Sequence, residues 1–545
     1  MKNILTILLS VFLAQSLNAQ KLTKEYDVLM SEVFKDDGPG AVALVVKDDK
    51  VVYRKAFGMA NLELGVEMKP DNIFRIGSIT KQFTASAILK LRDEGKLSLD
   101  DDITKYVEDY PTHGHEITLK HLLTHTSGIK SYTGMKEWDG EVRKKDFTPE
   151  ELIEFFKNQP MDFKPGEEWR YNNSAYFILG YIIEVVSDMS YGEYIDSAFF
   201  KPLEMNSSYY GSTSRIIKNR AYGYNKNDDG YINADFLSMT LPYAAGSLLS
   251  TVDDLYKWYS AVMDDKVISK ESREEAHSTY NLNNGEKTGY GYGWGIGNIQ
   301  GSLNISHGGG INGFLTSSMY LPEEKLFVAI FSNCNCNPPG SIATKMAALA
   351  LGKPFDWKPI TLSNDTMKEY EAVYETDKEE QRIITFKEGQ LFSLRTGGSK
   401  YKIYPFGEDK FFFDGGGVTT LHFVRNENGE IVSVTSKSTG YDMNWKRTNK
   451  PIPSIEEIEL DDSVTDKYLG KYELSPTFIL SIFREEGKMF AQATGQNKIE
   501  ILPYEKNKFS LVDVDAKLTF NMDENGEVTS LTLHQGGDHE AKKIE

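Results

Sequence analysis

The C-terminal part of the chain repeats itself, and this repeat constrains the possible folds more than any other feature. Residues 370–375 (YEAVYE) match residues 468–473 (YLGKYE) at an offset of 98 (468 − 370). Two later pairs keep nearly the same offset: 409–411 with 507–509, and 421–423 with 518–520. Ordered matches at a nearly constant offset predict two copies of one small module, which we place at residues 363–450 and 460–545.

Both copies have an all-β pattern. Short alternating segments replace the helical periodicity seen earlier in the chain, and Asn428-Gly429 and Asn525-Gly526 mark hairpin turns. Two copies are too few for a solenoid, and each is long enough to bury a core of its own. Because closure removes exposed strand edges, we expect two small barrel-like modules.

The preceding residues, 20–355, mix strand and helix patterns. Residues 40–57 predict a β-hairpin, and the apolar run 326–332 (LFVAIFS) predicts a buried strand. Apolar residues at helical spacing predict helices over 150–157, 175–186 and 253–263, and another that starts near Ser78 and stops at Gly95. Strands at both ends with helices between them indicate a mixed α/β domain.

The first 19 residues have the pattern of a secretory signal peptide. Lys2 provides the positive start, residues 4–13 are largely apolar, and Ala19 precedes a plausible cleavage point. We therefore expect an exported protein, periplasmic or secreted, whose mature chain begins near Gln20. No later run of about 18 apolar residues occurs, so we expect no transmembrane segment.

The net charge and the cysteine content limit which binding partners and cofactors we expect. The formal net charge of −19 argues against nucleic acid and against an anionic membrane surface as partners. The only cysteines, Cys334 and Cys336, are two residues apart, which is poor spacing for an unstrained disulfide and weak as a metal site. We expect free or partly buried thiols, no metal and no cofactor. The oligomeric state stays open.

A Ser-x-x-Lys motif is the first candidate for chemistry. Ser78 and Lys81 stand at the start of a helical pattern, and residues i and i+3 share one helix face, so Lys81 can reach the Ser78 hydroxyl. Lysine can activate a serine when burial or a nearby cation lowers its pKa toward neutrality. A second match, Ser127 with Lys130, is followed by no amphipathic helix. The alternative interpretation of the Ser78–Lys81 motif is that Ser78 caps the helix and Lys81 is solvated.

Two further motifs follow in order. Tyr171 and Asn173 form a Tyr-x-Asn motif, in which a phenol can relay a proton and an amide can bind a lysine or a substrate. His307 is followed by three glycines that end at Gly310, and glycines let a backbone approach a ligand closely. Each motif taken singly is weak, because Tyr-Asn pairs are frequent in turns and a lone histidine is more often structural.

The order of these motifs is far more specific than any one of them. Ser-x-x-Lys is followed by Tyr-x-Asn after 93 residues (171 − 78) and by His-x-Gly after another 136 (307 − 171). With the stretches FRIGSITK at 74–81 and HLLTHTSG at 121–128, the chain resembles the serine β-lactamase and penicillin-recognising peptidase family, in its class C-like branch. The resemblance covers residues 25 to 350, approximately.

This resemblance implies an α/β (α+β) fold of the β-lactamase/transpeptidase type, with the site between a helical region and an antiparallel sheet. It implies that Ser78 attacks a carbonyl carbon and that Lys81 and Tyr171 share the general-base and general-acid work. Asn173 would position both the substrate and Lys81.

The third motif carries the remaining implications. The oxyanion hole would consist of the backbone N–H groups of Ser78 and Gly310, with Gly309 contacting substrate. Family β-lactamases usually have Lys-Thr-Gly where this chain has His307-Gly-Gly, and the histidine is similar to D-aminopeptidase- and esterase-like members. A histidine offers positive charge to a substrate carboxylate only when it is protonated, below about pH 6.5 if its pKa is unperturbed.

We therefore expect a serine hydrolase of amide or ester bonds, and more specifically a peptidase on D-amino-acid or cell-wall-type peptides. A class C-like β-lactamase and a carboxylesterase are alternatives within the enzymes. A non-catalytic protein that binds penicillin or peptidoglycan is the alternative from another class. Expected partners are small peptide, ester or β-lactam substrates and, as a further candidate, peptidoglycan. The paired β modules, also similar to D-aminopeptidases, would brace or shade the catalytic domain or bind a ligand.

Overall fold

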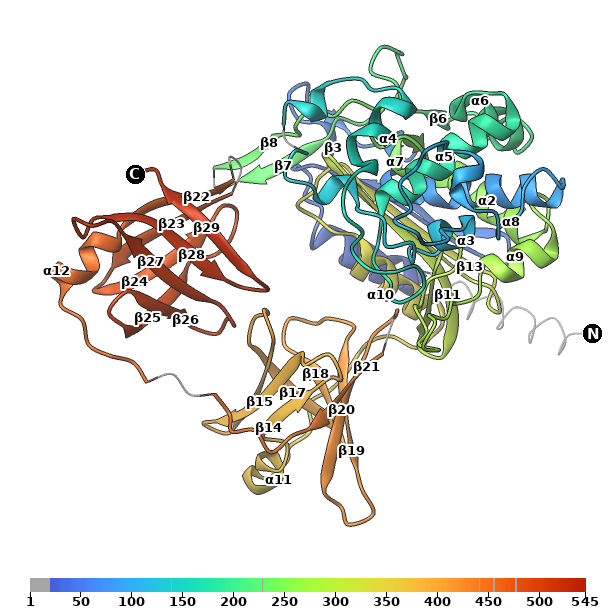
Figure 1. Cartoon of the computed structure of the whole chain (residues 1–545). Helices are drawn as coiled ribbons and strands as arrows, with labels where there is room; N and C mark the ends of the chain where they lie inside the picture. Colours follow the sequence, from blue (N-terminus) through green and yellow to red (C-terminus); the bar gives the residue numbers. More distant parts are fainter. Residues whose placement is uncertain (1–19, 139, 228, 441, 454–455, 476–477) are drawn as a thin grey trace, which may run out of the picture. The chain divides into compact units, whose positions relative to one another are not determined.

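The computed structural model describes residues 20–138, 140–227, 229–440, 442–453, 456–475 and 478–545. The predicted signal peptide, residues 1–19, lies outside the described residues. The chain divides into two compact units, one formed by residues up to 355 and the other mainly by residues 356–545. In Figure 1 the first unit runs from blue to yellow and the second from yellow-orange to red.

A six-stranded antiparallel sheet forms the centre of the first unit, in the order β10-β11-β12-β13-β1-β2. The strands are β1 (Ala41–Lys47), β2 (Lys50–Phe57), β10 (Gly295–Ile299), β11 (Ser302–Ile311), β12 (Phe314–Leu321) and β13 (Leu326–Ser332). All seven residues of β13 and the first six of β1 are buried, because both faces of the sheet are covered. The predicted hairpin and the predicted buried strand are both confirmed.

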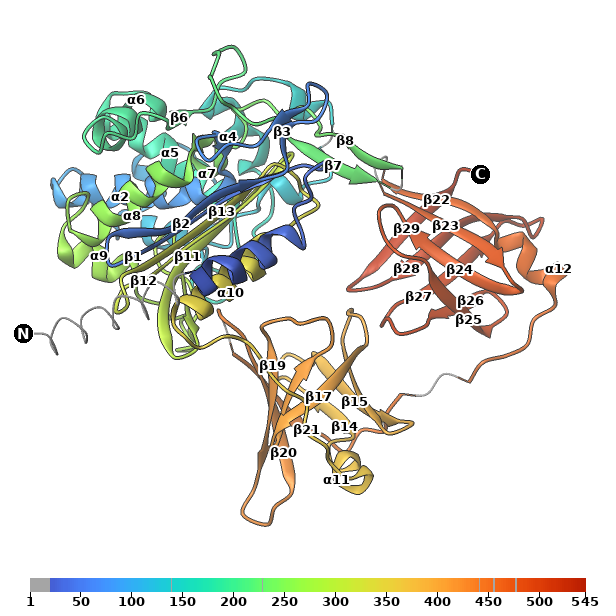
Figure 2. The same ribbon diagram turned by 180° about the vertical axis from the view of Figure 1, so that it is seen from behind.

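Helices cover the two faces of this sheet (Figure 2). On one face the helical residues 20–31 and α10 (Gly340–Ala350) lie side by side, and the Tyr26 hydroxyl donates to the Met346 carbonyl at 3.3 Å. On the other face α2 (Thr80–Asp93) and α8 (Val252–Met263) share a large apolar core with β1 and β13. Residues 307–311 of β11 extend beyond its pairing with β10, and Gly310 there lies against Gly77, just before α2.

The predicted helices are confirmed to within two residues: α4 spans Pro149–Lys157 and α5 spans Asn173–Ser187. The other short elements of this part are β3 (Met59–Asn61), β4 (Val66–Glu67), β5 (Phe74–Arg75), β6 (Tyr209–Tyr210), β7 (Tyr224–Asn227), β8 (Gly230–Asn233), β9 (Leu248–Ser250), α3 (Leu119–Leu123), α6 (Tyr191–Ile195), α7 (Tyr243–Gly246) and α9 (Lys270–Ala276). Across the described residues, no helix combines the length and the apolar character needed to span a bilayer.

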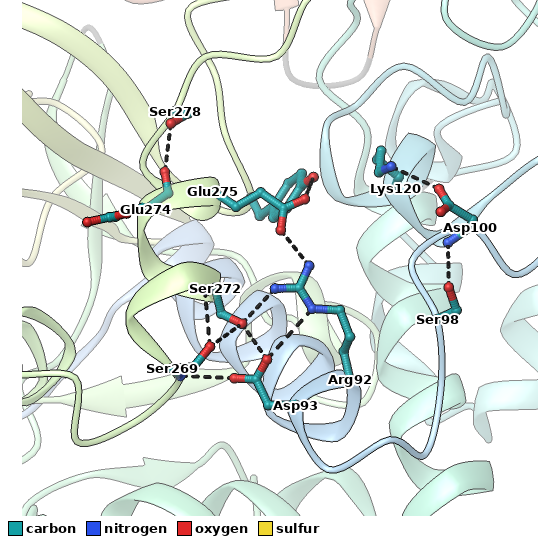
Figure 3. A network of polar contacts seen from close by, with 11 residues as sticks. Arg92, Asp93, Ser98, Asp100, Lys120, Ser269, Ser272, Glu274, Glu275 and Ser278 are labelled. Atoms are coloured by element: carbon teal, nitrogen blue, oxygen red, sulfur yellow. Dashed lines mark hydrogen bonds and ion pairs between the residues drawn. The ribbon is translucent and has the colours of Figure 1, made fainter.

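A polar network anchors the far end of α2 (Figure 3). Arg92 donates to Glu275 of α9 at 2.5 Å, and the Ser269 backbone N–H donates to Asp93 at 2.9 Å. Ser272 donates to the same Asp93 carboxylate. Single pairs of this kind contribute little at a surface, but a network with shared partners holds its elements in register. It fixes the helix whose first turn carries Lys81.

The second unit contains two closed antiparallel barrels of eight strands each, as the repeat predicted. The first consists of β14 (Ala372–Glu375), β15 (Gln381–Lys387), β16 (Gln390–Arg395), β17 (Tyr401–Gly407), β18 (Lys410–Phe413), β19 (Thr420–Arg425), β20 (Ile431–Lys437) and β21 (Met443–Arg447). The second consists of β22 (Gly470–Ser475), β23 (Phe478–Glu485), β24 (Lys488–Ala493), β25 (Ile499–Glu505), β26 (Lys508–Leu511), β27 (Lys517–Met522), β28 (Val528–His534) and β29 (Asp538–Lys543). Short helices, α11 (Asn364–Lys368) and α12 (Asp462–Thr465), precede them.

The two barrel interiors differ at equivalent positions. Tyr374 pairs with Arg382 in the first barrel, and Tyr472 pairs with Leu480 in the second, so Arg382 takes the place of Leu480. The strand registers likewise equate Ser393 with Ala491 and Trp445 with Ala541. Arg382 is 6% exposed, donates to Ser393 at 2.8 Å and lies 4.3 Å from the Trp445 ring centroid. Burial lowers the pKa of Arg382 to about 10.

The prediction of free cysteines is wrong. Cys334 and Cys336 form a disulfide with each other. The chain turns directly after β13, which brings their Cα atoms to 5.1 Å, within the range that a disulfide accepts. Sequence spacing alone missed this because it says nothing of a local turn.

Candidate active site

Ser78 and Lys81 lie side by side at the start of α2. Ser78 is the middle residue of a 3-10 turn (Gly77–Ile79) that runs directly into the helix. The Lys81 Nζ lies 3.3 Å from the Ser78 Oγ. Lys81 is fully buried, whereas Ser78 is half-buried and lines an open pocket. The hydroxyl is thus accessible to a ligand while the amine beside it is shielded from water.

The surroundings of Lys81 favour the neutral amine. Burial lowers its pKa well below the ordinary value. Its Nζ donates to the Asn173 side-chain oxygen and to the Ala245 carbonyl, each at 2.8 Å. A neutral amine has two N–H groups and one lone pair, so these two bonds use both donors. The lone pair remains for the Ser78 hydroxyl, which is the arrangement that a general base requires.

Tyr171 covers this pair. The Lys81 Nζ lies 4.7 Å from the centroid of its ring. The Tyr171 hydroxyl is buried and forms no regular hydrogen bond within the described residues. Burial raises the pKa of Tyr171, and the neighbouring Ser78 hydroxyl only partly offsets this. Tyr171 is therefore a neutral phenol, suited to donating a proton to a group bound at Ser78.

Asn173 is held at the first turn of α5. Its side-chain NH₂ donates to the Thr133 hydroxyl at 3.1 Å, and its backbone N–H donates to the Ser131 hydroxyl at 3.2 Å. The preceding Asn172 caps the helix by accepting from the Ala175 N–H. These bonds orient the Asn173 amide so that its oxygen faces Lys81.

His125 is part of the site, although no role for it was predicted from the sequence. Its ring centroid lies 4.4 Å from that of Tyr171 and 4.8 Å from that of Tyr290. Its Nδ1 accepts from the Asn172 backbone N–H at 3.1 Å. Burial, with a smaller contribution from the Lys81 charge, lowers the pKa of His125. His125 is thus a neutral ring that supports Tyr171, and its presence in the HLLTHTSG stretch was the available signal.

His307 lies on β11 beside the same aromatic group. Its Nε2 is 2.8 Å from the Tyr290 hydroxyl, and its ring centroid is 6.2 Å from that of Tyr171. Burial, and then the Lys81 charge, lower the pKa of His307 to about 4. The condition of an unperturbed pKa near 6.5 is therefore not met. At neutral pH His307 carries no charge that could attract a carboxylate.

Two glycines allow β11 to reach the nucleophile. Gly77 has a φ of 53°, and a side chain there would meet the Gly310 backbone nitrogen at 2.9 Å. A Cβ on Gly309 would lie 2.0 Å from the Ile76 carbonyl oxygen. Gly310 lines the pocket with Ser78, and its oxyanion role stays a prediction. Gly309 packs against the Ile76 carbonyl and is not among the described residues that line the pocket, so its contact with substrate also stays a prediction.

The pocket beside Ser78 has a volume of about 160 Å³ and lies within the first unit. Asn173 and Gly310 line it together with Tyr132, Trp138 and Arg143. The competing Ser-x-x-Lys pair is elsewhere: Ser127 is fully buried, and Lys130 pairs with Asp162 at 2.9 Å. In the part of the chain that the structure describes, no cluster of three or more side chains suitable for a metal ion occurs.

The first unit has the serine hydrolase fold of the penicillin-recognising type. Residues 22–353 match the Beta-lactamase family, and residues 456–543, which hold the second barrel, match a domain of unknown function, DUF3471. Because the first match spans more than half of the chain, the protein belongs to the Beta-lactamase family. The predicted family and fold class are confirmed.

Several known proteins are similar to this chain. Penicillin-binding protein 4* of Bacillus subtilis (strain 168) is 28% identical over 396 residues, which cover 68% of this chain and 86% of that protein. Among solved structures, the octameric penicillin-binding protein homologue from Pyrococcus abyssi has 32% identity and a TM-score of 0.56, covering 78% of this chain and 99% of that one. A D-stereospecific amidohydrolase from Streptomyces sp. has 26% identity and a TM-score of 0.50, covering 56% and 94%.

Proposed function

We propose that this protein is an exported serine amidohydrolase that cleaves D-amino-acid or cell-wall-type peptides through an acyl-enzyme on Ser78. The observation that carries the proposal is the Ser78–Lys81 pair, in which a buried amine with a strongly lowered pKa lies 3.3 Å from a hydroxyl that lines an open pocket. A pair of this kind can form and break an ester at neutral pH without a metal in the described site.

The residues divide the reaction as follows. Ser78 Oγ attacks the carbonyl carbon of the substrate while its proton passes to Lys81 Nζ. The backbone N–H groups of Ser78 and Gly310 stabilise the negative oxygen, each by about 3 kcal/mol. The C–N bond then breaks as the leaving nitrogen takes the Tyr171 proton, which Lys81 replaces. Water hydrolyses the ester by the reverse proton transfers and restores Ser78.

Two observations favour an amide of the D-series over a β-lactam. His307 stands where family β-lactamases usually have a lysine, and its lowered pKa leaves it uncharged at neutral pH. A β-lactam carboxylate would find no fixed charge at that position. The similarity to a D-stereospecific amidohydrolase supports the choice of substrate class.

A substrate panel tests the proposal. Purified residues 20–545 should hydrolyse D-alanine 4-nitroanilide faster than its L-enantiomer, a chromogenic cephalosporin or 4-nitrophenyl acetate. Ser78→Ala should abolish turnover and labelling by a fluorophosphonate probe. Ser127→Ala is the matched control, since it removes the hydroxyl of the competing motif, and should keep both.

Each other outcome points to a named alternative. Cephalosporin turnover above all amides would support a β-lactamase, and turnover confined to esters would support a carboxylesterase. Labelling of Ser78 by penicillin without turnover of any substrate would indicate a binding protein.

The proposal that the protein is exported rests on the sequence of residues 1–19 alone. It is tested by N-terminal sequencing of protein secreted by a native-like host, where a start near Gln20 is expected and an intact Met1 would refute it.

A further inference from the structure

One cation lines the pocket beside Ser78. Arg143 belongs to a 3-10 turn (Val142–Lys144) on the connection between α3 and α4, and its side chain is half-buried. Among the described residues that line the pocket, it is the only one with a charged side chain. In a protein with a formal charge of −19, an arginine placed at the substrate pocket needs a physical explanation.

The arginine is held in place but has no anionic partner among the residues that the structure describes. One terminal nitrogen donates to the Trp138 carbonyl at 3.0 Å, and the Arg143 carbonyl accepts from the Ser238 N–H at 2.9 Å. The Nε atom is buried and has no acceptor within the described residues. The next residue, Lys144, instead forms an ion pair with Glu141 at 2.6 Å. An unpaired guanidinium N–H is costly unless a ligand supplies the acceptor.

Neither Lys81 nor His307 offers a permanent positive charge beside Ser78. Burial lowers the pKa of Lys81 well below its ordinary value, and that of His307 to about 4. An arginine stays charged throughout the pH range in which proteins work. Its planar guanidinium can donate two parallel hydrogen bonds to one carboxylate. Arg143 is therefore the group in this site that can recognise an anion at neutral pH.

The position of the pocket indicates which part of the substrate it receives. Along β11, Gly310 and the residues after it line the pocket, whereas His307 does not. His307 lies instead beside Tyr171, the proposed proton donor to the leaving nitrogen. The leaving group thus belongs on the His307 side of Ser78. The acyl group extends the other way, toward Arg143.

We propose that Arg143 binds a carboxylate on the acyl portion of the substrate, so that the enzyme prefers amides of acidic acyl groups such as an acidic D-amino acid. This inference rests on the proposed acyl-enzyme reaction. The rings of Tyr132 and Trp138, with centroids 4.7 Å apart, supply an apolar wall for the carbon chain that carries the carboxylate.

Matched substrate pairs test the inference. D-Glutamate and D-glutamine 4-nitroanilides differ only by the charged group on the acyl side, and we expect at least a tenfold higher kcat/KM for D-glutamate. Mono-4-nitrophenyl adipate and 4-nitrophenyl hexanoate form the equivalent ester pair. D-Alanine 4-carboxyanilide and D-alanine 4-nitroanilide place a carboxylate on the leaving group instead, and Arg143 should not affect the preference between them.

Variants of Arg143 test whether its side chain causes the preference for acidic acyl groups. Arg143→Met should lower kcat/KM for the acidic acyl substrates at least tenfold more than for the neutral members of the same pairs. Arg143→Lys should recover part of the loss, because a lysine restores the positive charge but cannot form the two parallel hydrogen bonds of a guanidinium. Lys144→Met is the control, since it removes the same charge from the same turn at a residue that does not line the pocket, and it should leave every ratio unchanged.

The outcomes separate this inference from the proposed reaction. Absence of any preference for the acidic acyl member in the wild type overturns the role of Arg143, whatever the variants do. An equal loss on acidic and neutral substrates in both Arg143 variants also overturns it. In either case Ser78-dependent turnover of the neutral substrates would leave the proposed function intact, whereas turnover that survives Ser78→Ala would refute that function first.

Discussion

The Tyr290 hydroxyl lies 2.8 Å from the Nε2 of His307, inside the aromatic group that also contains Tyr171 and His125. This contact places His307 against the proton-transfer residues, whereas Gly310 of the same motif lines the substrate pocket. It changes the chemistry that the motif predicts, because a half-buried imidazole that is desolvated on one side and bonded to a phenol stays neutral where a fully exposed one would titrate.

The low pKa of His307 predicts how activity depends on pH. A histidine that attracted a carboxylate by its charge would lose that attraction near pH 6.5. With a pKa of about 4, His307 is neutral on both sides of that value. We expect no drop in kcat/KM for carboxylate-bearing substrates, relative to neutral ones, between pH 5.5 and 8. His307→Lys should add a permanent charge and raise relative activity on cephalosporins.

The same group should make stability depend on pH. In the unfolded chain His307 titrates near pH 6.5, and in the folded chain near 4, so the unfolded state binds more protons between these values. Stability is therefore fully present above pH 6.5, falls as pH decreases, and stops falling below about 4. His307→Gln should reduce this slope in denaturant titrations of the full chain. An unchanged slope would show that the imidazole is not desolvated.

Lys81 and Tyr171 should act as one unit. Lys81→Ala and Tyr171→Phe should each lower the rate of acylation at least a hundredfold. The double variant should lose much less than the product of the two factors, because both groups serve the same proton. Stopped-flow acylation by an activated ester measures all four rates. Simple multiplication of the two losses would show that the residues do not share a proton path.

Neighbouring glycines of the third motif should respond differently to alanine. A Cβ on Gly309 would lie 2.0 Å from the Ile76 carbonyl oxygen, directly before the turn that carries Ser78. We expect Gly309→Ala to destabilise the protein by about 1–3 kcal/mol and to slow acylation. Gly308→Ala is the control, because a Cβ on Gly308 would lie 3.4 Å from its nearest neighbour, the Thr316 carbonyl oxygen. Equal tolerance of the two substitutions in thermal unfolding and acylation assays would contradict this packing role.

The interior arginine of the first barrel should reduce its stability. Leu480 occupies the equivalent position of the second barrel, so Arg382→Leu replaces a buried cation with a residue that the module already accepts. We expect a gain of about 1 kcal/mol, seen as slower hydrogen exchange in β15 and β16. Leu480→Arg, the reverse change, should destabilise the second barrel. Faster exchange in Arg382→Leu would show that its bonds to Ser393 and Trp445 outweigh desolvation.

Much of the fold followed from the sequence because periodicity and repetition are local properties. The β-rich run and polar turn of residues 40–57, the helical spacing after Ser78 and the 98-residue repeat each predicted a feature that the structure contains. The i, i+3 spacing of Ser78 and Lys81 likewise determined their contact, since a helical turn brings such residues together wherever it occurs.

Only the tertiary structure decided the electrostatics and the substrate pocket. The pKa values of Lys81 and His307 depend on burial by segments far away in the chain, so their charge could not be read from the motif itself. The place of Arg143 beside Ser78 also depends on how the connection between α3 and α4 folds back over the site. Sequence spacing determines which groups are neighbours within one helical turn, whereas desolvation and the assembly of a pocket require the packed chain.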